Sequence, residues 1–251
     1  MTEKLSKQDN NVNPSKLIAS NINGFYELKN DPSKIIRIQS FNNIKETYGN
    51  NTDPKFVVEL AKKLFNEIET NYNIPTPVEF VVGKNEKEED VVYCITDKIE
   101  GESLDKIERT PELIKKIEDL YTSISKYYFD KFNTKEAHLA DINATSQYVY
   151  GKKKGDVEPK IYLVDTDLYI NKGDVALLHN VKWLVRHMPF KINEAEKYIR
   201  EIIQQPLSQN LSDAEKLIAQ KEIKESLNFL NGTYKQGDEI DDIGFISTLL
   251  Y

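Results

Sequence analysis

Two short apolar strands, joined by a basic turn, constrain this chain more than any other stretch. A polar loop carrying Asp141 precedes the first strand, which we predict over Tyr148–Gly151. The second strand, predicted over Lys160–Val164, ends at Asp165 and Asp167. Because the strands of a hairpin run in opposite directions, the start of the first and the end of the second meet. The hairpin therefore predicts two carboxylate sets at one end, which can hold a cation and a phosphate near a nucleophile.

Composition and charge disfavour several classes of function. Of the 251 residues 39% are hydrophobic, enough for a core in one large domain or in two lobes. The net charge of −7 gives no overall basic surface for nucleic acid or an anionic membrane. No apolar run reaches the ~18 residues that cross a bilayer, and the polar N-terminus has no apolar signal core. We therefore expect a cytoplasmic protein without nucleic-acid or membrane partners.

The cysteine and histidine content limits the metals that the chain could bind. Cys94 is the single cysteine, and there are three histidines. One cysteine cannot form an internal disulfide, and this set cannot build a thiolate or imidazole zinc cluster. We expect any metal to be held mostly by oxygen, which favours Mg²⁺ or Mn²⁺.

The first hundred residues change from strand to helix and back to strand. Residues 1–14 are polar and Asn-rich, which predicts a flexible tail. Short apolar runs over 17–41, separated by turn formers, predict an antiparallel meander in which Arg37 lies on the face opposite its β-branched neighbours. Apolar residues at helical spacing after a Thr-Asp-Pro start predict a helix over Asp53–Tyr72. A strand pair follows, predicted over Val78–Gly83 and Val91–Thr96.

The rest of the chain is predicted to be mostly helical. Residues 97–103, with a glycine that breaks the strand pattern, form a candidate linker, which we call the hinge segment. A periodic helix begins at Thr110-Pro111, and a capping box marks the start of the last helix at Ser212. Between the hairpin and the C-terminus the predicted helices are Val175–Met188, Asn193–Gln204 and Ser212–Leu230. We therefore predict two lobes, residues 15–96 and 104–251, on either side of the hinge segment.

The order of these elements resembles the protein-kinase-like fold, closest to its aminoglycoside and small-molecule phosphotransferases. Ile-Pro-Thr-Pro at 74–77, followed by a strand pair and TDKIEGESL, looks like the family's passage from helix to strand and then its hinge. HLADINATSQYVY and IYLVDTD look like its catalytic loop and metal-binding strand end. The resemblance, over roughly residues 17–190, implies a two-lobed α+β fold. A small antiparallel sheet with one helix would precede a mainly helical lobe that carries the catalytic hairpin.

The resemblance implies roles for the residues around the hairpin. Asp141 matches the catalytic base that orients the acceptor hydroxyl, and Asp165 matches the carboxylate that holds Mg²⁺ against the nucleotide phosphates. The family has an asparagine as second metal ligand about five residues after the base, but Ser146 stands there. The second ligand is thus unassigned among its polar neighbours, Asn143, Gln147 and Asp167.

The resemblance also implies a nucleotide site in the first lobe. Arg37 would take the place of the lysine that grips the phosphates, with Glu59 as its helix partner. Backbone groups of Asp97 to Ile99 would hold the adenine of ATP, with Ile95 at the back of the pocket. Gly24 is the single glycine in the turn that matches the family's glycine-rich loop.

Structural roles for several of these residues compete with the functional ones. Asp141 could be a cap or turn residue, and Arg37 and Glu59 could lie on the solvated surface. We expect His138 to hold its loop through backbone hydrogen bonds and Trp183 to belong to the core.

Three functions follow from these alternatives. The first is an ATP-dependent phosphotransferase acting on a hydroxyl of an unidentified small molecule. The second is a non-catalytic, kinase-like protein that binds a nucleotide or acts as a scaffold, favoured by the missing glycines and by arginine in place of lysine. The third is a glycosyltransferase that holds Mn²⁺ and a nucleotide sugar through Asp165-Thr166-Asp167. That fold needs alternating strands and helices before the motif, and the meander argues against it.

Overall fold

The computed structural model describes residues 12–17, 25–28, 31–40, 49, 52–84, 88, 90–165 and 168–232. The chain divides into two compact units. Unit 1 contains Met1–Pro111 and Thr145–Leu168, and unit 2 contains Glu112–Ala144 and Tyr169–Tyr251. The described part is α+β, as the sequence predicts, with small antiparallel sheets and five α-helices. These units follow different bounds from the predicted lobes, since the hairpin after residue 144 belongs to unit 1.

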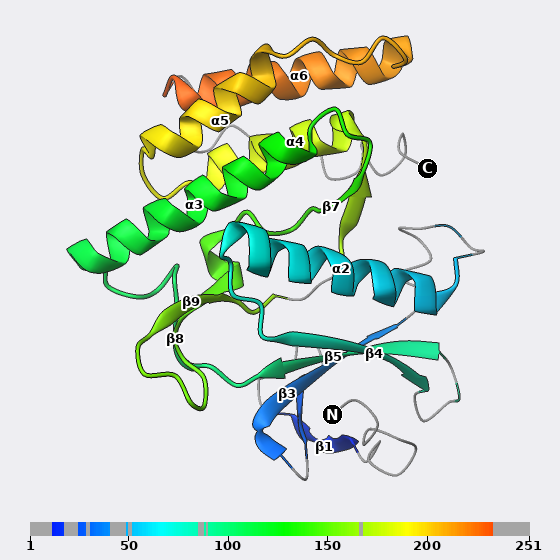
Figure 1. The fold of residues 1–251 in the computed structure, drawn as a ribbon, viewed down its shortest axis with the longest axis vertical. Coiled ribbons are helices and arrows are strands. Elements are labelled where there is room, and N and C mark those ends of the chain that lie inside the picture. The colour runs from blue at the N-terminus through cyan, green and yellow to red at the C-terminus, as the bar shows by residue number, and fades with distance from the viewer. Residues whose placement is uncertain are drawn as a thin grey trace. The chain divides into compact units, whose positions relative to one another are not determined.

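A five-stranded antiparallel sheet forms the largest part of unit 1 (Figure 1). Its strand order is β1-β2-β3-β5-β4, so the predicted meander and strand pair join in one sheet. The strands are β1 (Val12–Leu17), β2 (Phe25–Leu28), β3 (Asp31–Ser40), β4 (Val78–Lys84) and β5 (Asp90–Asp97). β1 begins inside the segment predicted as a tail, because an edge strand is held by backbone pairing with β2 and needs few apolar side chains. Residues 1–11 lie outside the described part.

Helix α2 (Pro54–Tyr72) packs against β4 and β5 of this sheet (Figure 1). Asp53 caps it by accepting a hydrogen bond from the Lys55 N–H, and proline occupies its first turn. Asn73 ends it in the left-handed conformation, with φ of 55°. Most of the predicted apolar stripe is buried on the sheet side, where the rings of Phe65 and Phe80 lie 5.0 Å apart, but Phe56 at its start is 60% exposed.

The two faces of the sheet carry different residues. Ile36 packs in a buried cluster with Val91, Tyr93 and Ile95. Arg37 lies directly opposite Cys94, and Cys94 opposite Phe80, so all three point to the α2 face. The prediction that Arg37 lies opposite its β-branched neighbours is confirmed.

A three-stranded antiparallel sheet completes unit 1. It consists of β6 (Glu100–Ser103), β8 (Tyr148–Lys152) and β9 (Lys160–Leu163), with β8 in the centre. The predicted hairpin is thus confirmed as β8 and β9, and it pairs with the hinge segment through β6. Gly101 and Gly151 face each other in this pairing, and a Cβ atom on Gly101 would lie 2.2 Å from the Tyr150 carbonyl oxygen. The two backbones can therefore approach this closely only with glycine at these positions.

Unit 2 is mainly helical. Its helices are α3 (Pro111–Lys131), α4 (Asp174–His187), α5 (Asn193–Gln204) and α6 (Asp213–Leu230), and a two-stranded sheet pairs β7 (Ala137–Leu139) with β10 (Ile170–Lys172). The predicted capping box of α6 is present, because Ser212 and Glu215 exchange both hydrogen bonds. α4 packs along α6. In the described ranges no helix is both long and apolar enough to span a bilayer.

Candidate functional site

An ion pair joins two of the predicted site residues of unit 1. The Arg37 Nη1 atom donates a hydrogen bond to Asp165 Oδ1 at 3.0 Å, across 128 positions of sequence. The Arg37 side chain is 12% exposed and that of Asp165 is 34% exposed. A guanidinium and a carboxylate at a partly open position can each accept a charged ligand in place of the other. The pair is therefore a candidate site for an anion with its counter-cation.

Backbone hydrogen bonds fix the strand end that carries Asp165. The Leu163 N–H donates to the Pro75 carbonyl at 3.0 Å, beyond the end of α2. The N–H groups of Val164 and Asp165 both donate to the Gln147 carbonyl, at 3.0 and 3.3 Å. Gln147, a predicted metal ligand, is buried and anchors β9 through its backbone. The end of β9 is thus held on two sides before the chain reaches Asp165.

The end of β5 presents one free acceptor and one free donor. The Asp97 N–H donates to the Pro77 carbonyl at 3.0 Å, but proline has no N–H to return the bond. On its other side Asp97 faces Lys34 in a pair that exchanges no hydrogen bonds, because the bond to β3 is made by Lys98 and Ser33. Within the described ranges, the Asp97 carbonyl and the Ile99 N–H therefore have no hydrogen-bond partner.

The chemistry of this edge is selective. In an extended chain, the carbonyl of one residue and the N–H two residues later point to the same side. The Asp97 carbonyl can accept from an exocyclic amino group while the Ile99 N–H donates to a ring nitrogen. Adenine offers this pair of groups, whereas guanine has an acceptor oxygen where adenine has its amino group. The Asp97 carbonyl and the Ile99 N–H are the two groups that the predicted adenine contacts would use, and adenine binding stays a prediction.

Two lysines form salt bridges with the side chain of Asp97 at the end of β5. The Asp97 carboxylate lies 3.1 Å from Lys34 Nζ on β3 and 3.5 Å from Lys153 Nζ in the turn between β8 and β9. Both contacts are about one third exposed, so solvent weakens them. Their effect is to link the edge of one sheet of unit 1 to the hairpin of the other.

Two of the predicted nucleotide residues do not join Arg37 in the described structure, and a third lies outside it. Ile95 points to the opposite face, because Arg37 is in register with Cys94 and neighbours along a strand alternate; Thr96 shares the Arg37 face instead. Glu59 is 71% exposed and pairs with Lys62 at 2.9 Å, since it lies away from the buried stripe of α2. The turn with Gly24 lies outside the described residues.

Asp141, the predicted catalytic base, is an exposed residue of unit 2 in the loop that follows β7. The Ala140 N–H donates to the Tyr169 carbonyl at 2.8 Å, which fixes the start of the loop. Asn143, a predicted metal ligand, is buried: its Oδ1 accepts from the Tyr128 hydroxyl at 2.8 Å and its Nδ2 donates to the Ala140 carbonyl at 3.1 Å. The Asn143 amide therefore braces the loop from inside.

The tyrosines of α3 are functional candidates that the sequence analysis missed. The Tyr127 hydroxyl accepts from the Leu139 N–H at 2.9 Å. The Tyr121 hydroxyl lies 3.0 Å from the Asn143 carbonyl and 3.0 Å from the carbonyl of His187 on α4. In the helical pattern tyrosines count as apolar positions, so the periodicity does not single them out. The available signal was their hydroxyl groups, since a buried phenol needs a hydrogen-bond partner.

The described residues do not bring several metal-binding side chains together. Among the described residues no group of three or more His, Cys, Asp or Glu side chains is placed to hold a metal ion. Thr166 and Asp167 lie outside the described ranges, and so does the Asp-x-Asp motif as a unit. Asp165 is the predicted carboxylate ligand that the structure describes. Mg²⁺ sites commonly use one or two carboxylates and complete their shell with water and substrate phosphates, so one carboxylate fits such an ion.

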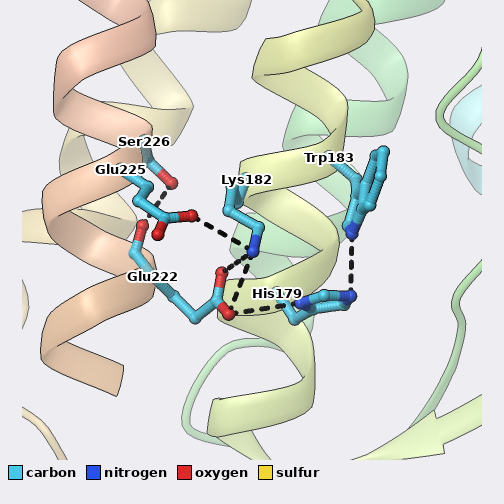
Figure 2. A network of polar contacts seen from close by, with 6 residues as sticks. All are labelled: His179, Lys182, Trp183, Glu222, Glu225 and Ser226. Carbon is cyan, nitrogen blue, oxygen red and sulfur yellow. Dashed lines mark hydrogen bonds and ion pairs between the residues drawn. The ribbon is translucent and has the colours of Figure 1, made fainter. Parts of the chain in front are cut away.

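A second charged cluster, between α4 and α6, is buried (Figure 2). Lys182 Nζ, with a side chain that is 0% exposed, lies 2.9 Å from Glu222 Oε2 and 3.3 Å from Glu225 Oε2. Burial alone would raise the pKa of Glu222, but hydrogen bonds from His179 and Lys182 and the Lys182 charge lower it below its usual value. This cluster joins the two helices through buried charges that are paired with one another.

Trp183 sets the protonation pattern of His179 in this cluster. The indole Nε1–H of Trp183 lies 2.8 Å from His179 Nε2 (Figure 2). An indole can only donate, so Nε2 carries a lone pair and the proton of the neutral ring is on Nδ1. Nδ1 lies 3.3 Å from Glu222 Oε1, to which it donates. The expected structural role of Trp183 thus extends to a polar contact at the edge of the core.

His138 has the structural position that the sequence analysis expects. It is 1% exposed and has a hydrogen bond with the Glu136 backbone, while its Nε2 has no partner in the described structure. Burial lowers the pKa of His138 to about 4, against the opposing effect of that hydrogen bond. The ring is therefore neutral near pH 7.

Comparison with known proteins does not identify the chain. No family model matches the sequence. No curated protein matches it either. A solved structure described as a microcompartment-associated aminopropanol kinase is similar over 86% of this chain and 89% of its own, with 10% sequence identity and a TM-score of 0.38. Values this low do not establish a shared fold or function. The order of elements in this chain is compatible with a kinase-like fold on its own geometry.

Proposed function

We propose that the chain binds an adenine nucleotide in unit 1 and transfers a phosphoryl group to a hydroxyl of a small molecule. The observation that carries this proposal is the ion pair between Arg37 and Asp165, a cation and an anion held together at a half-open strand end. The open carbonyl of Asp97 and N–H of Ile99, in the same unit, favour adenine as the base.

In this proposal Arg37 changes partner when the nucleotide binds. Its guanidinium would leave Asp165 for the phosphate oxygens, which offer more negative charge. The freed Asp165 carboxylate would hold Mg²⁺ or Mn²⁺, which supplies neutralisation of phosphate charge. Arg37 would contribute to the same neutralisation from the sheet, and rigid backbone bonds at Leu163 and Asp165 would keep both groups in position.

The transfer step assigned to this chain needs a proton acceptor. A bond would form between the acceptor oxygen and the terminal phosphorus while the bond from that phosphorus to the bridging oxygen breaks, leaving a nucleoside diphosphate. The hydroxyl proton would pass to the carboxylate of Asp141, which orients the oxygen for attack. The acceptor itself stays unidentified.

Calorimetry with ATP and Mg²⁺ tests the proposal. We expect the wild type to bind, Asp165→Ala and Arg37→Met to lose at least about tenfold in affinity, and GTP to bind more weakly than ATP. Glu59→Ala is the matched control, because it removes a paired carboxylate of the same unit that faces solvent. A wild type that binds neither ATP nor ADP would refute the proposal.

A non-catalytic nucleotide-binding protein is the second candidate. It is favoured by the Asn143 amide, which is engaged with Tyr128 and Ala140 and so is not free to serve as the second metal ligand. Incubation of the wild type with ATP and a panel of hydroxyl compounds separates the two functions. Transfer or hydrolysis that is lost in Asp141→Ala supports the enzyme. Nucleotide binding and thermal stabilisation without any turnover support the second candidate.

The glycosyltransferase alternative is tested in the same calorimetric series. Its motif falls partly outside the described residues, and the sheet of unit 1 is antiparallel with one helix instead of alternating. Binding of a nucleotide sugar that depends on Mn²⁺, together with no binding of ATP, would reverse the ranking.

A further inference from the structure

The loop that carries Asp141 is held by a chain of buried hydrogen bonds from Tyr128 through Asn143 to Ala140. The Tyr128 hydroxyl lies 3.0 Å from the Ala140 carbonyl and 2.8 Å from Asn143 Oδ1, and Asn143 Nδ2 lies 3.1 Å from the same carbonyl. A carbonyl can only accept, so Nδ2 must face Ala140 and Oδ1 must face the hydroxyl. The single hydroxyl proton of Tyr128 is donated to Oδ1, the nearer acceptor, and Nδ2 donates to the Ala140 carbonyl, so the amide links the hydroxyl to the loop backbone in a fixed orientation.

This set of bonds spans Asp141 in the sequence. Ala140 precedes Asp141 directly, Asn143 follows two positions later, and Tyr128 reaches both from α3. Tyr128 is 0% and Asn143 is 6% exposed, whereas Asp141 is exposed. The inner side of the loop is therefore fixed to the helix while the carboxylate is left on the outer side. A short loop with no ladder of its own takes its conformation from such side chains.

We propose that Tyr128 and Asn143 are positioning residues, which fix the backbone of residues 140–143 and thereby aim the carboxylate of Asp141 at the acceptor hydroxyl. This rests on the proposed function, in which Asp141 is the base. Correct aim matters because proton transfer needs the carboxylate within hydrogen-bonding reach of the hydroxyl. Asn143 acts here through the loop and not through a metal.

Tyr128→Phe is the direct test, because it keeps the ring and removes only the hydroxyl. The buried Asn143 oxygen then loses its donor, and the loop is expected to open more often. Ser125→Ala is the matched control: Ser125 is a buried hydroxyl on the same helix, and it donates to the Tyr121 carbonyl at 2.8 Å without touching the loop.

Amide hydrogen exchange measures the loop without any assumption about function. In Tyr128→Phe we expect exchange of the amides of 139–144 to accelerate at least about tenfold, while the amides of α3 and of unit 1 keep their wild-type rates. Ser125→Ala should leave the loop unchanged. Asn143→Ala removes the other half of the brace and should give the same local effect, so the test does not depend on one variant. Wild-type exchange in the loop of both brace variants would overturn the proposal.

Turnover provides the second readout. We expect kcat for transfer or hydrolysis to fall about tenfold in Tyr128→Phe with KM for ATP within about twofold, because the nucleotide groups of unit 1 are untouched. A purely structural defect would instead lower the active fraction or change both constants. An unchanged kcat with a loosened loop would also overturn the proposal. Absence of turnover in the wild type would refute the proposed function, and the exchange rates would still decide whether Tyr128 and Asn143 hold the loop.

Discussion

Arg37 in unit 1 and Lys182 in unit 2 are both cations paired with carboxylates, but they differ in burial. The carboxylate of Asp165 is 34% exposed, whereas Glu222 beside Lys182 is 1% exposed. Water can take the place of Arg37 beside Asp165 at low cost, because that carboxylate is about one third exposed, whereas the Arg37 side chain is 12% exposed and needs an anionic partner. In the second pair each charge depends on the other, since removing one leaves the other without solvent. The first pair suits exchange with a ligand, and the second suits holding two helices together.

The largest effect that follows from this comparison is expected for Glu222→Ala. The variant leaves Lys182 buried with only Glu225, at 3.3 Å and on one side, so we expect a loss of about 3 kcal/mol of unfolding free energy, the low end for a broken buried pair. Urea denaturation measures it. Glu118→Ala, an exposed acid on α3, is the control with an expected change below about 0.5 kcal/mol. A loss below about 1 kcal/mol for Glu222→Ala would mean that water reaches Lys182.

A double variant separates the value of the pair from the cost of breaking it. Lys182→Met with Glu222→Gln removes both charges and keeps the volume roughly constant. We expect it to recover more than half of the loss seen in Glu222→Ala, because the two least exposed charges are removed and the remaining Glu225, 15% exposed, has some contact with water. The same urea series measures this. A double variant as unstable as the single one would show that the unpaired Lys182 charge is not the cause of the loss, because the glutamine of Glu222→Gln still offers an acceptor to His179.

A second buried group of unit 2, His138, is expected to make the protein sensitive to acid. Its folded pKa of about 4 lies below the ordinary 6.5, so the unfolded chain takes up a proton first. Stability is unaffected above about pH 6.5, falls as the pH drops from there, and loses about 3 kcal/mol by about pH 4. Urea denaturation against pH checks this.

The acid effect of His138 is separable from that of Glu222. Glu222 has a lowered folded pKa, so it stabilises the fold above its ordinary value of 4.5 and loses this only as the pH falls below that value. The window between about pH 6.5 and 4.5 thus excludes Glu222 and reports on His138 together with His187, whose pKa burial also lowers. In His138→Gln the stability curve should be flatter there. An unchanged slope would contradict the neutral, buried ring.

The exposed pair is expected to affect binding more than stability. Arg37→Met should cost less than about 1 kcal/mol of unfolding free energy, because Asp165 is about one third exposed and gains water when its partner leaves. ATP affinity should nevertheless fall at least about tenfold, since a phosphate contact is lost. Thermal unfolding and calorimetry on one sample measure both. A stability loss near that of Glu222→Ala would remove the distinction between the two pairs.

The smallest effect is expected on the surface of α2. Lys62→Ala removes the i,i+3 pair with Glu59, whose carboxylate is 71% exposed, and should cost about 0.3 kcal/mol. Thermal unfolding in low and high salt measures it, and the difference should vanish in high salt. A cost above about 1 kcal/mol would show that Glu59 has a role beyond the surface.

The sequence predicts the regular elements well because their signals are local. The helix over Asp53–Tyr72 is found as α2, Asn193–Gln204 is found as α5, and the capping box at Ser212 is present. The hairpin is also found, since its turn residues separate two apolar runs. Each of these depends on neighbours within a few positions of the chain.

The candidate site is less predictable because it depends on register and on distant contacts. Ile95 was predicted to back the pocket, yet a shift of one residue in strand pairing decides which face it takes. Glu59 and Glu222 are both helix acids in sequence, and only packing tells the exposed one from the buried one. The partners of Tyr128 lie in a loop whose path no periodic pattern encodes.

Pro77 keeps the Asp97 carbonyl open because its ring leaves no N–H group to donate to it. The Asp97 N–H already donates to the Pro77 carbonyl at 3.0 Å. Any other residue at position 77 would have an N–H group that could donate in return to the Asp97 carbonyl. Pro77→Ala would thus lengthen the pairing of β4 and β5 by one bond and remove the acceptor for an exocyclic amine. Arg37 and Asp165 would be left unaltered, so inorganic triphosphate should still compete for them while preference for adenine disappears. Discrimination between bases would in that case be encoded by an imino acid that touches no ligand.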